Sequence, residues 1–235
     1  MLHSSGSPRL NTLNKTMIGV LLLHAMLAGP ALAALAPAPS ASADEIARAV
    51  QQRYDHIYDF TADFTHTYEG GVLKKTSTER GVVEVKKPGR MRWEYTSPEK
   101  KLFVSDGLKI YSYIPADKQV IVSPVPADSD TPAALFLSGK GDITRDFTVH
   151  FTTGGGSNQW ALRLDPKAHQ NDYDWLVLIV DKQSLRIDSL VASDQQGGRS
   201  TFAFTNYHEN TGLPDSAFAF KIPRGVDVIT SGSDR

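Results

Sequence analysis

The stretch VVEVKKPGRMRWEYTSPEKKLFVSDGLKIYSYIPADKQVIV, residues 82–122, decides the fold. Its short apolar runs are separated by four turn signals: Lys87-Pro88-Gly89, Thr96-Ser97-Pro98, Asp106-Gly107 and Pro115-Ala116-Asp117. Asp-Gly between two alternating runs is a strong hairpin signal, because a tight type I′ turn requires positive φ at its centre. The stretch therefore predicts an antiparallel meander of short strands.

Alternation within this meander divides its side chains between two faces. Period two along one strand places large apolar side chains on one face and charged side chains on the other. The apolar set is Met91, Trp93 and Tyr95, and the charged set is Arg90, Arg92 and Glu94. No catalytic motif accompanies this pattern, so the question becomes what the apolar face holds.

The segment upstream alternates even more strictly. One face carries Tyr58, Phe60, Ala62, Phe64, His66 and Tyr68, and the other carries Asp59 and four Thr or Asp residues. Such alternation predicts a long, half-buried strand. Gly70-Gly71 then turns the chain into a second long strand, near residues 72–86.

Three segments read as helical. Asp44-Glu45 starts a helix over residues 44–57, whose apolar positions follow helical spacing. Thr131-Pro132 is an N-cap followed by proline, and it opens a short apolar helix that stops at Gly139. Residues 142–146 can add one further turn. A short helix that is apolar all round must be covered, or must itself act as a lid.

Alternating segments continue towards the end of the chain, near residues 147–153, 159–164, 173–180, 185–192 and 200–207. Together with the earlier runs they amount to about eleven strands, without alternation of strands and helices. We therefore expect a mainly β fold with some α-helix, built on a single antiparallel sheet with helices on one side. A sheet of this size curls into a barrel or half-barrel.

The N-terminus reads as a secretory signal peptide. Two basic residues precede an apolar run from Met17 to Leu27, and Ala31-Leu32-Ala33 has the form of a cleavage site. We expect residues 1–33 to be the signal peptide, 34–43 a flexible linker and 44–235 one domain. Cleavage after Ala36 or Ala43, a start at Met17 and an uncleaved anchor are the alternatives.

Composition narrows the function further. The chain has no cysteine, which excludes both disulfides and a lipid-modified cysteine after the signal, so we expect a soluble protein of a bacterial periplasm. Residues 34–235 carry 23 Lys and Arg against 26 Asp and Glu, a balance that argues against nucleic acid or anionic lipid as partners. The histidines lack metal-ligand spacing, and no nucleophile elbow or phosphate loop occurs. We expect no metal, no cofactor and no enzymatic activity.

Several blocks of the sequence resemble the LolA family of periplasmic lipoprotein carriers. The middle block is V-K-K-P-G-R-M-R-W-E-Y at residues 85–95, V-S-D-G at 104–107 and Tyr111. Thr131-Pro132 opening an apolar helix is similar to the same family, as is the C-terminal block from Phe202 to Val226. The resemblance spans roughly residues 44–229, essentially all of the expected mature chain.

The resemblance implies a fold and a function. The family fold is an unclosed half-barrel of eleven strands with a helical lid over its concave face, and the cavity takes the acyl chains of lipoproteins. An inner-membrane ABC transporter supplies the cargo, an outer-membrane lipoprotein receptor accepts it, and the free carrier is a monomer. The periplasm of a Gram-negative bacterium is the implied compartment.

The resemblance also implies a site. The positions that match cavity-lining or lid positions of the family are Tyr54, Phe60, Phe64, Met91, Trp93, Tyr111, Ala133 and Phe136. Lys87 stands where the family typically has an arginine that hydrogen-bonds backbone carbonyls of the lid, and it is the expected lid latch. An ammonium lacks the planar fork with which a guanidinium grips several acceptors.

Two other classes of function stay open at this point. One is a related half-barrel carrier of another lipid or glycolipid, or a periplasmic lipid or stress sensor. The other is a lipid-processing enzyme assembled from residues that no motif reveals. Without the resemblance, the aromatic positions are simply hydrophobic core.

Overall fold

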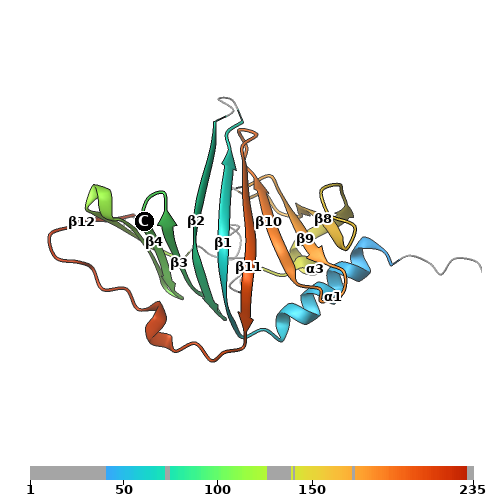
Figure 1. The fold of residues 1–235 in the computed structure, drawn as a ribbon, viewed down its shortest axis with the longest axis horizontal. Helices are drawn as coiled ribbons and strands as arrows, with labels where there is room; N and C mark the ends of the chain where they lie inside the picture. Colours follow the sequence, from blue (N-terminus) through green and yellow to red (C-terminus); the bar gives the residue numbers. More distant parts are fainter. Residues whose placement is uncertain (1–40, 72–74, 126–138, 140, 171–172, 232–235) are drawn as a thin grey trace, which may run out of the picture. The chain divides into compact units, whose positions relative to one another are not determined.

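The fold is described from a computed structural model of the chain, which covers residues 41–71, 75–125, 139, 141–170 and 173–231. The chain divides into two units, Met1–Pro39 and Ser40–Arg235, and all described residues belong to the second. Their dominant feature is one sheet of twelve strands, with α1 against it (Figure 1). The helices are α1 (Ala43–Asp55) and α3 (Ile143–Asp146), with 3-10 turns η1 (Pro115–Asp117) and η4 (Asp215–Phe218).

The strands follow the expected meander. They are β1 (Asp59–Glu69), β2 (Thr76–Lys86), β3 (Arg90–Ser97), β4 (Lys101–Asp106), β5 (Lys109–Ile114), β6 (Gln119–Pro124), β7 (Phe147–Phe151), β8 (Gln159–Pro166), β9 (Trp175–Asp181), β10 (Ile187–Ser193), β11 (Arg199–Glu209) and β12 (Asp227–Thr230). Their order in the sheet is β12-β6-β5-β4-β3-β2-β1-β11-β10-β9-β8-β7. Because β12 and β7 are the two ends of this order, the sheet is an unclosed half-barrel, as expected.

The sheet departs from the expectation at one edge. The alternating segments predict about eleven antiparallel strands, whereas β12 is a twelfth strand and pairs in parallel with β6. The C-terminal chain reaches this edge by crossing the sheet as an irregular segment, residues 210–226, which we call the strap. A parallel pair of strands requires such a crossover connection, and no local turn pattern in the sequence predicts this one.

Helix α1 begins with a capping box. The Ser42 hydroxyl accepts a hydrogen bond from the Glu45 amide (3.2 Å), and the Glu45 carboxylate accepts one from the Ser42 amide (2.7 Å). This arrangement satisfies amides that the first turn leaves unpaired, and it holds the pKa of Glu45 below its usual value. Ile46, Val50 and Tyr54 then fall on one buried side of the helix. The helix ends at Asp55, two residues before the expected end.

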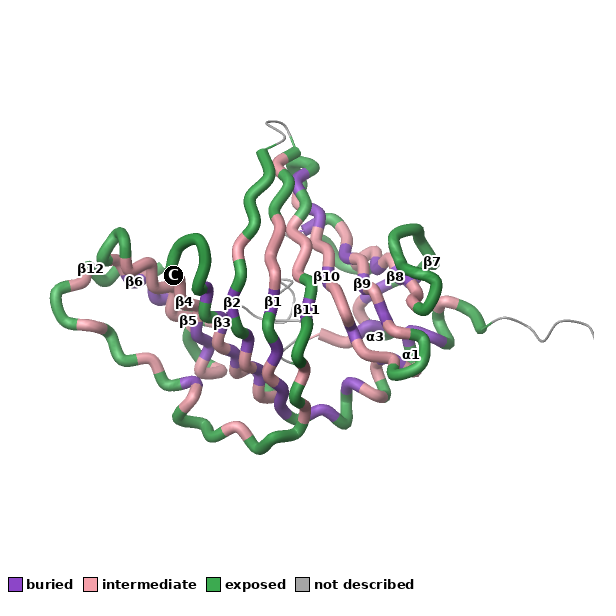
Figure 2. The backbone as a smooth tube through the Cα atoms, in the orientation of Figure 1, coloured by how far each residue is buried: buried purple, intermediate pink, exposed green. Residues whose placement is uncertain are grey.

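The sheet has two faces, which we call inner and outer. The inner face carries Phe64, Trp93 and Leu178, and the buried side of α1 belongs to the same apolar core. The outer face carries Val104 and Val120, both fully buried although neither belongs to that core. Burial is concentrated at the start of β1 and the end of β2, near α1, while residues 68–69 of β1 and 76–78 of β2 are exposed (Figure 2).

The strap covers the part of the outer face around β3, β4 and β5. Phe218 from η4 is 1% exposed, and the Lys86 ammonium donates to Asp215 Oδ1 (2.6 Å) and to the Leu213 carbonyl (2.7 Å). Asp59 is buried here because its carboxylate accepts hydrogen bonds from the Thr211 and Gly212 amides, at 2.8 and 3.1 Å. The strap thus stabilises the start of β1 from outside.

Three local expectations need correction or stay open. The alternation predicts Tyr58 on the apolar face of the first strand, but Tyr58 precedes β1 and is 68% exposed. The Asp106-Gly107 hairpin is confirmed, with positive φ at Gly107 but not at its neighbours, so it is not a type I′ turn. The helix expected from Thr131 to Gly139 lies outside the described residues except for Gly139, whereas the turn at residues 142–146 is confirmed as α3.

Candidate functional site

An aromatic cluster lines the inner face across the four neighbouring strands β3, β2, β1 and β11. Phe64 is at its centre, with ring centroids 5.0 Å from Trp93, 4.8 Å from Tyr95 and 6.4 Å from Phe202. Trp93 also meets Phe202 edge to face at 5.2 Å. Strand register explains the gathering, because Ala62 pairs with Val83 and Val83 with Trp93, which puts alternate residues of three strands on one face.

Phe60 and Met91 extend this cluster towards α1. Phe60 is 2% exposed, and its ring centroid lies 5.7 Å from that of Tyr207. The ring centroid of Phe204 lies 6.0 Å from that of Tyr207. The indole Nε1 of Trp93 donates to the Met91 sulfur at 3.3 Å. A flexible thioether and loosely tilted rings form a surface that can repack around an apolar ligand. The structure therefore brings together four of the expected positions, namely Phe60, Phe64, Met91 and Trp93.

Tyr54 and Lys87 meet at the C-terminal end of α1. The Lys87 ammonium donates to the Tyr54 carbonyl and lies 3.7 Å from the centre of the Tyr54 ring. Burial lowers the pKa of Lys87 to about 8, against a smaller opposing effect of Asp55. The Lys87 stem passes Gly139 so closely that a Cβ there would lie 3.0 Å from Cδ. Lys87, directly after β2, thus contacts both α1 and Gly139, the residue at which the sequence predicts the end of the mid-chain helix.

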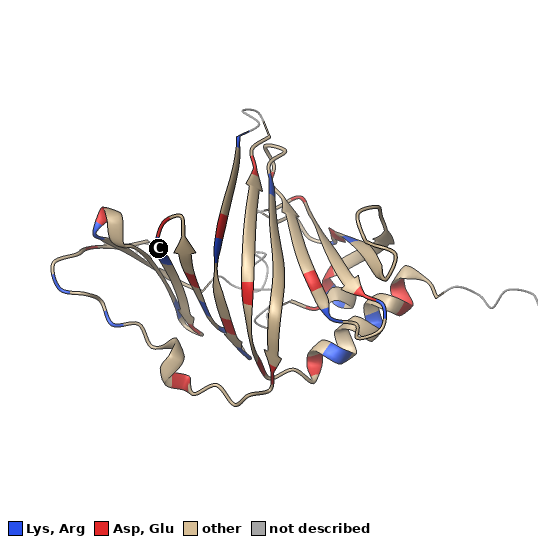
Figure 3. Ribbon diagram, viewed as in Figure 1, with Lys and Arg blue, Asp and Glu red and all other residues tan. Residues whose placement is uncertain are grey.

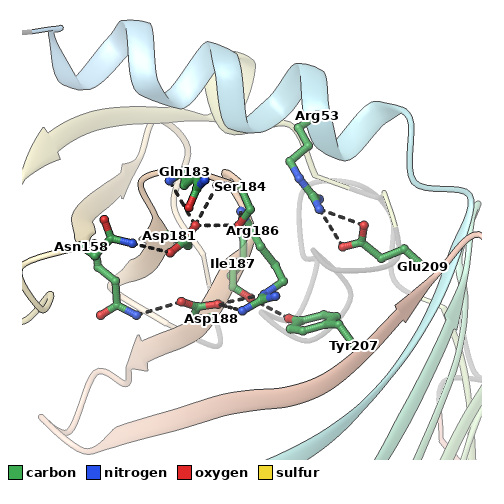
Figure 4. Close-up of polar contacts among 11 residues, drawn as sticks. Arg53, Asn158, Asp181, Gln183, Ser184, Arg186, Ile187, Asp188, Tyr207 and Glu209 are labelled. Atoms are coloured by element: carbon green, nitrogen blue, oxygen red, sulfur yellow. Dashed lines mark hydrogen bonds and ion pairs between the residues drawn. The ribbon is translucent and has the colours of Figure 1, made fainter.

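A second polar contact holds the same end of α1 and was not foreseen from the sequence. Arg53 Nη2 donates to both carboxylate oxygens of Glu209 at the end of β11, at 2.9 and 2.8 Å (Figure 4). Beside it, the Tyr207 hydroxyl donates to the Ile187 carbonyl at 2.6 Å. The first contact joins residues that are 156 positions apart in the sequence, and the second joins residues that are 20 positions apart. No local sequence pattern could therefore predict them. Helix α1 is therefore tied to the sheet from both β2 and β11.

Tyr111 lies on the opposite face of the sheet from the aromatic cluster. Trp93 pairs with Phe103, whereas Tyr111 pairs with the next residue, Val104, so its side chain is directed to the outer face. There its ring lies 5.3 Å from Phe220 of the strap. The structure does not bring Tyr111 together with the other expected cavity residues.

A groove of about 380 Å³ adjoins Tyr111 on the outer face, between β5, β6, the strap and β12. Apolar atoms dominate its lining, which includes Val122, Ile222 and Val228. The remaining expected positions, Ala133 and Phe136, lie outside the described residues.

A polar group within the inner face was also missed. His66 stacks on Phe202 at 4.2 Å, and its Nδ1 lies 3.4 Å from Glu79 Oε2. The Lys101 ammonium donates to Glu79 Oε1 at 2.6 Å. Burial lowers the pKa of His66, although the Glu79 carboxylate acts in the opposite direction. The alternation of β1 predicts that the His66 side chain is on the inner face, but it does not identify the residues that contact it.

The described part of the chain offers nothing that resembles a metal site, since no group of three or more histidine, aspartate and glutamate side chains is suitably placed. Within the same residues, no helix combines the length and the apolar character needed to cross a membrane. Charged residues of both signs are interspersed along the strands and α1 (Figure 3). The chemistry available at the inner face is thus the burial of apolar groups, with a few hydrogen-bonding groups at its rim.

Comparisons with known proteins agree with this interpretation. Residues 55–221 match the family model described as "Outer membrane lipoprotein carrier protein LolA". A protein of Chromohalobacter salexigens named outer-membrane lipoprotein carrier protein is 30% identical over 86% of this chain and 93% of its own length. One of the same name from Methylibium petroleiphilum is 34% identical over 72% of this chain and 81% of its own length.

Among solved structures, an uncharacterised conserved protein from Thermus thermophilus has a TM-score of 0.51. The alignment covers 78% of this chain and 98% of that one at 13% identity, which supports the fold alone.

Proposed function

Because this chain belongs to the LolA family of outer membrane lipoprotein carrier proteins, we propose that it is a periplasmic carrier that shelters the acyl chains of lipoproteins on the inner face of its sheet. The observation that carries the proposal is the aromatic cluster around Phe64 and Trp93, which shares one apolar core with a helix that polar contacts hold at one end. The carrier has no catalytic role in this account.

The hydrophobic effect supplies the affinity. Burying one methylene contributes about 0.8 kcal/mol, so a single sixteen-carbon chain offers roughly 12 kcal/mol if it is fully buried. A rigid pocket of that quality would not release its cargo. A carrier that uses no nucleotide can release its cargo only if part of this binding free energy is offset. Separating aromatic rings that contact one another in the empty site has a free-energy cost, and this cost provides the offset.

Tyr54, Phe60, Phe64, Met91 and Trp93 are the proposed acyl-chain contacts, and Lys87 is the proposed latch. Opening must separate the Lys87 ammonium from the Tyr54 carbonyl and ring, and must loosen the Arg53–Glu209 pair. Each contact favours the empty, closed arrangement, so each weakens net affinity for cargo. Ala133 and Phe136 stay proposed lid positions, whereas the outer-face position of Tyr111 gives no support for a cavity role.

Delivery completes the proposal. The carrier, acting as a monomer in the periplasm of a Gram-negative bacterium, takes lipoproteins from an inner-membrane ABC transporter and passes them to an outer-membrane lipoprotein receptor. Transfer proceeds because the receptor binds the acyl chains more tightly than this adaptable face does. Residues 1–33 act as the export signal.

A lipopeptide-binding experiment tests the proposal. The mature protein is incubated with a synthetic triacylated cysteine peptide, and native mass spectrometry measures the complex. We expect a one-to-one complex for the native protein and little for Trp93→Glu, which puts a charge into the cluster. Val82→Glu, an exposed site on the opposite face of the adjacent strand, is the matched control and should bind normally. Absence of a complex with the native protein, or equal loss in both variants, contradicts the proposal.

A further inference from the structure

His66 places an imidazole within the otherwise apolar inner face. Its ring is parallel to that of Phe202, with a 4° interplanar angle and 4.2 Å between centroids, and edge-on to Tyr95 at 6.1 Å. Both ring nitrogens are shielded from solvent, and neither makes a hydrogen bond to any other described residue. Buried polar atoms in native proteins nearly always have a partner, so this pair of nitrogens requires an explanation.

Burial and the neighbouring charges act in opposite directions on the protonation of this ring. Glu79, paired with His66 across β1 and β2, has its Oε2 atom 3.4 Å from Nδ1, and Lys101 from β4 neutralises the other carboxylate oxygen. Burial lowers the pKa of His66, so the ring is neutral near pH 7. The carboxylate beside Nδ1 favours the tautomer that carries its proton there, which leaves a lone pair on Nε2.

We propose that His66 Nε2 accepts a hydrogen bond from an N–H group in the head of a bound acyl ligand, so that the inner face prefers an amide-linked chain to an ester-linked one. The inference rests on the proposed function, because it requires acyl chains to enter the aromatic cluster. An amide N–H is a donor and an ester has none. A ligand with this donor relieves the unsatisfied nitrogen of the empty protein, whereas an ester or a hydrocarbon leaves it unpaired.

A matched pair of ligands isolates this hydrogen bond. N-butyldodecanamide and butyl dodecanoate have the same chain length and differ at the linking group. Each is titrated against the mature protein loaded with diphenylhexatriene, a hydrocarbon whose fluorescence reports occupancy of an apolar site. The quantity measured is the ratio of the two dissociation constants, which cancels contributions that the ligands share.

His66→Phe is the test variant, because phenylalanine can keep the stacking on Phe202 and remove the acceptor. We expect the preference for the amide to fall about tenfold in this variant, the size of a buried hydrogen bond. His150→Phe, the same substitution at an exposed histidine of β7, is the control and should keep the native ratio.

Two results overturn the inference in distinguishable ways. If diphenylhexatriene binds and both ligands displace it, but His66→Phe leaves the ratio unchanged, the role of His66 is wrong and the carrier function stands. If neither the hydrocarbon nor either ligand binds the native protein, the acyl site itself is absent, and both proposals fail.

Discussion

The guanidinium of Arg53 on α1 contacts both carboxylate oxygens of Glu209 on β11, at 2.9 and 2.8 Å, with each side chain about a quarter exposed. On the other side of the same helical turn, Lys87 from the end of β2 donates to the Tyr54 carbonyl. Consecutive residues of α1 are therefore attached to strands that flank β1 on opposite sides. These two contacts together hold the C-terminal turn of α1 against the sheet.

Removing the Arg53 contact should loosen α1. Arg53→Met keeps the apolar stem and leaves the Glu209 carboxylate unpaired, so we expect the free energy of unfolding to fall by about 1 kcal/mol. Diphenylhexatriene uptake should rise, because a contact of the closed arrangement is lost. Arg48→Met, on the exposed side of the same helix, is the control. Equal effects of the two substitutions in urea denaturation and dye uptake would contradict a fastening role.

Lys87 should make ligand uptake depend on alkaline pH. Its pKa is about 8 in the closed arrangement, against an ordinary value of 10.5 for an exposed lysine. Burial in the closed arrangement disfavours the charged form, so between these values the open arrangement binds more protons. The neutral amine can still donate to the Tyr54 carbonyl, and raising the pH therefore favours closure. We expect diphenylhexatriene affinity to decrease as the pH rises from 8 to 10.5.

Lys87→Arg provides the comparison for this pH effect. Arginine stays charged throughout the range, so the variant should lose the dependence. Lys86→Arg, in which the replaced ammonium contacts the strap on the outer face, should retain it. A native protein whose uptake does not change with pH, or a Lys87→Arg variant that follows the native curve, would refute the latch.

The two faces of the sheet should respond differently to loss of an aromatic side chain. Trp93→Ala opens a cavity within the cluster, and we expect it to weaken lipopeptide binding about tenfold or more and to lower the free energy of unfolding by about 3 kcal/mol. Tyr111→Ala removes a ring that packs on Phe220 of the strap, so it should affect stability but leave lipopeptide affinity within about twofold. Calorimetric titration of both variants measures the difference, and a Tyr111→Ala variant that loses binding would place the ligand on the outer face.

The inner face was predictable from the sequence because period-two alternation is a local property. Phe60, Phe64, Met91 and Trp93 share a face whatever the order of the strands, provided that each strand's apolar side is turned inwards. The capping residue Ser42 was overlooked, although its spacing to Glu45 is a standard helix-start signal. The resemblance matches Tyr111 to a cavity-lining position of the family, but it does not fix which face of the sheet the side chain is on. That face depends on the register of two successive hairpins, β3–β4 and β4–β5.

Other features could not have been read from local patterns. The strap has no periodicity, and its course depends on contacts such as Asp59 with the Thr211 amide and burial of Phe218. The Arg53–Glu209 pair joins α1 to the end of β11, 156 positions later in the sequence, and the two become neighbours because β1 pairs with β11. The parallel strand β12 follows from the strap, since its register on β6 is set by where the crossover ends.

Release of lipoprotein from a membrane is the most direct test of whether the protein is a lipoprotein carrier. Spheroplasts that carry radiolabelled lipoprotein and a lipoprotein-releasing transporter are incubated with the purified mature protein, and the soluble fraction is analysed by size-exclusion chromatography. We expect soluble lipoprotein in a one-to-one complex with the native protein and little with Trp93→Glu. Lipoprotein that stays in the membrane with the native protein, while a known carrier releases it in the same preparation, would contradict the account.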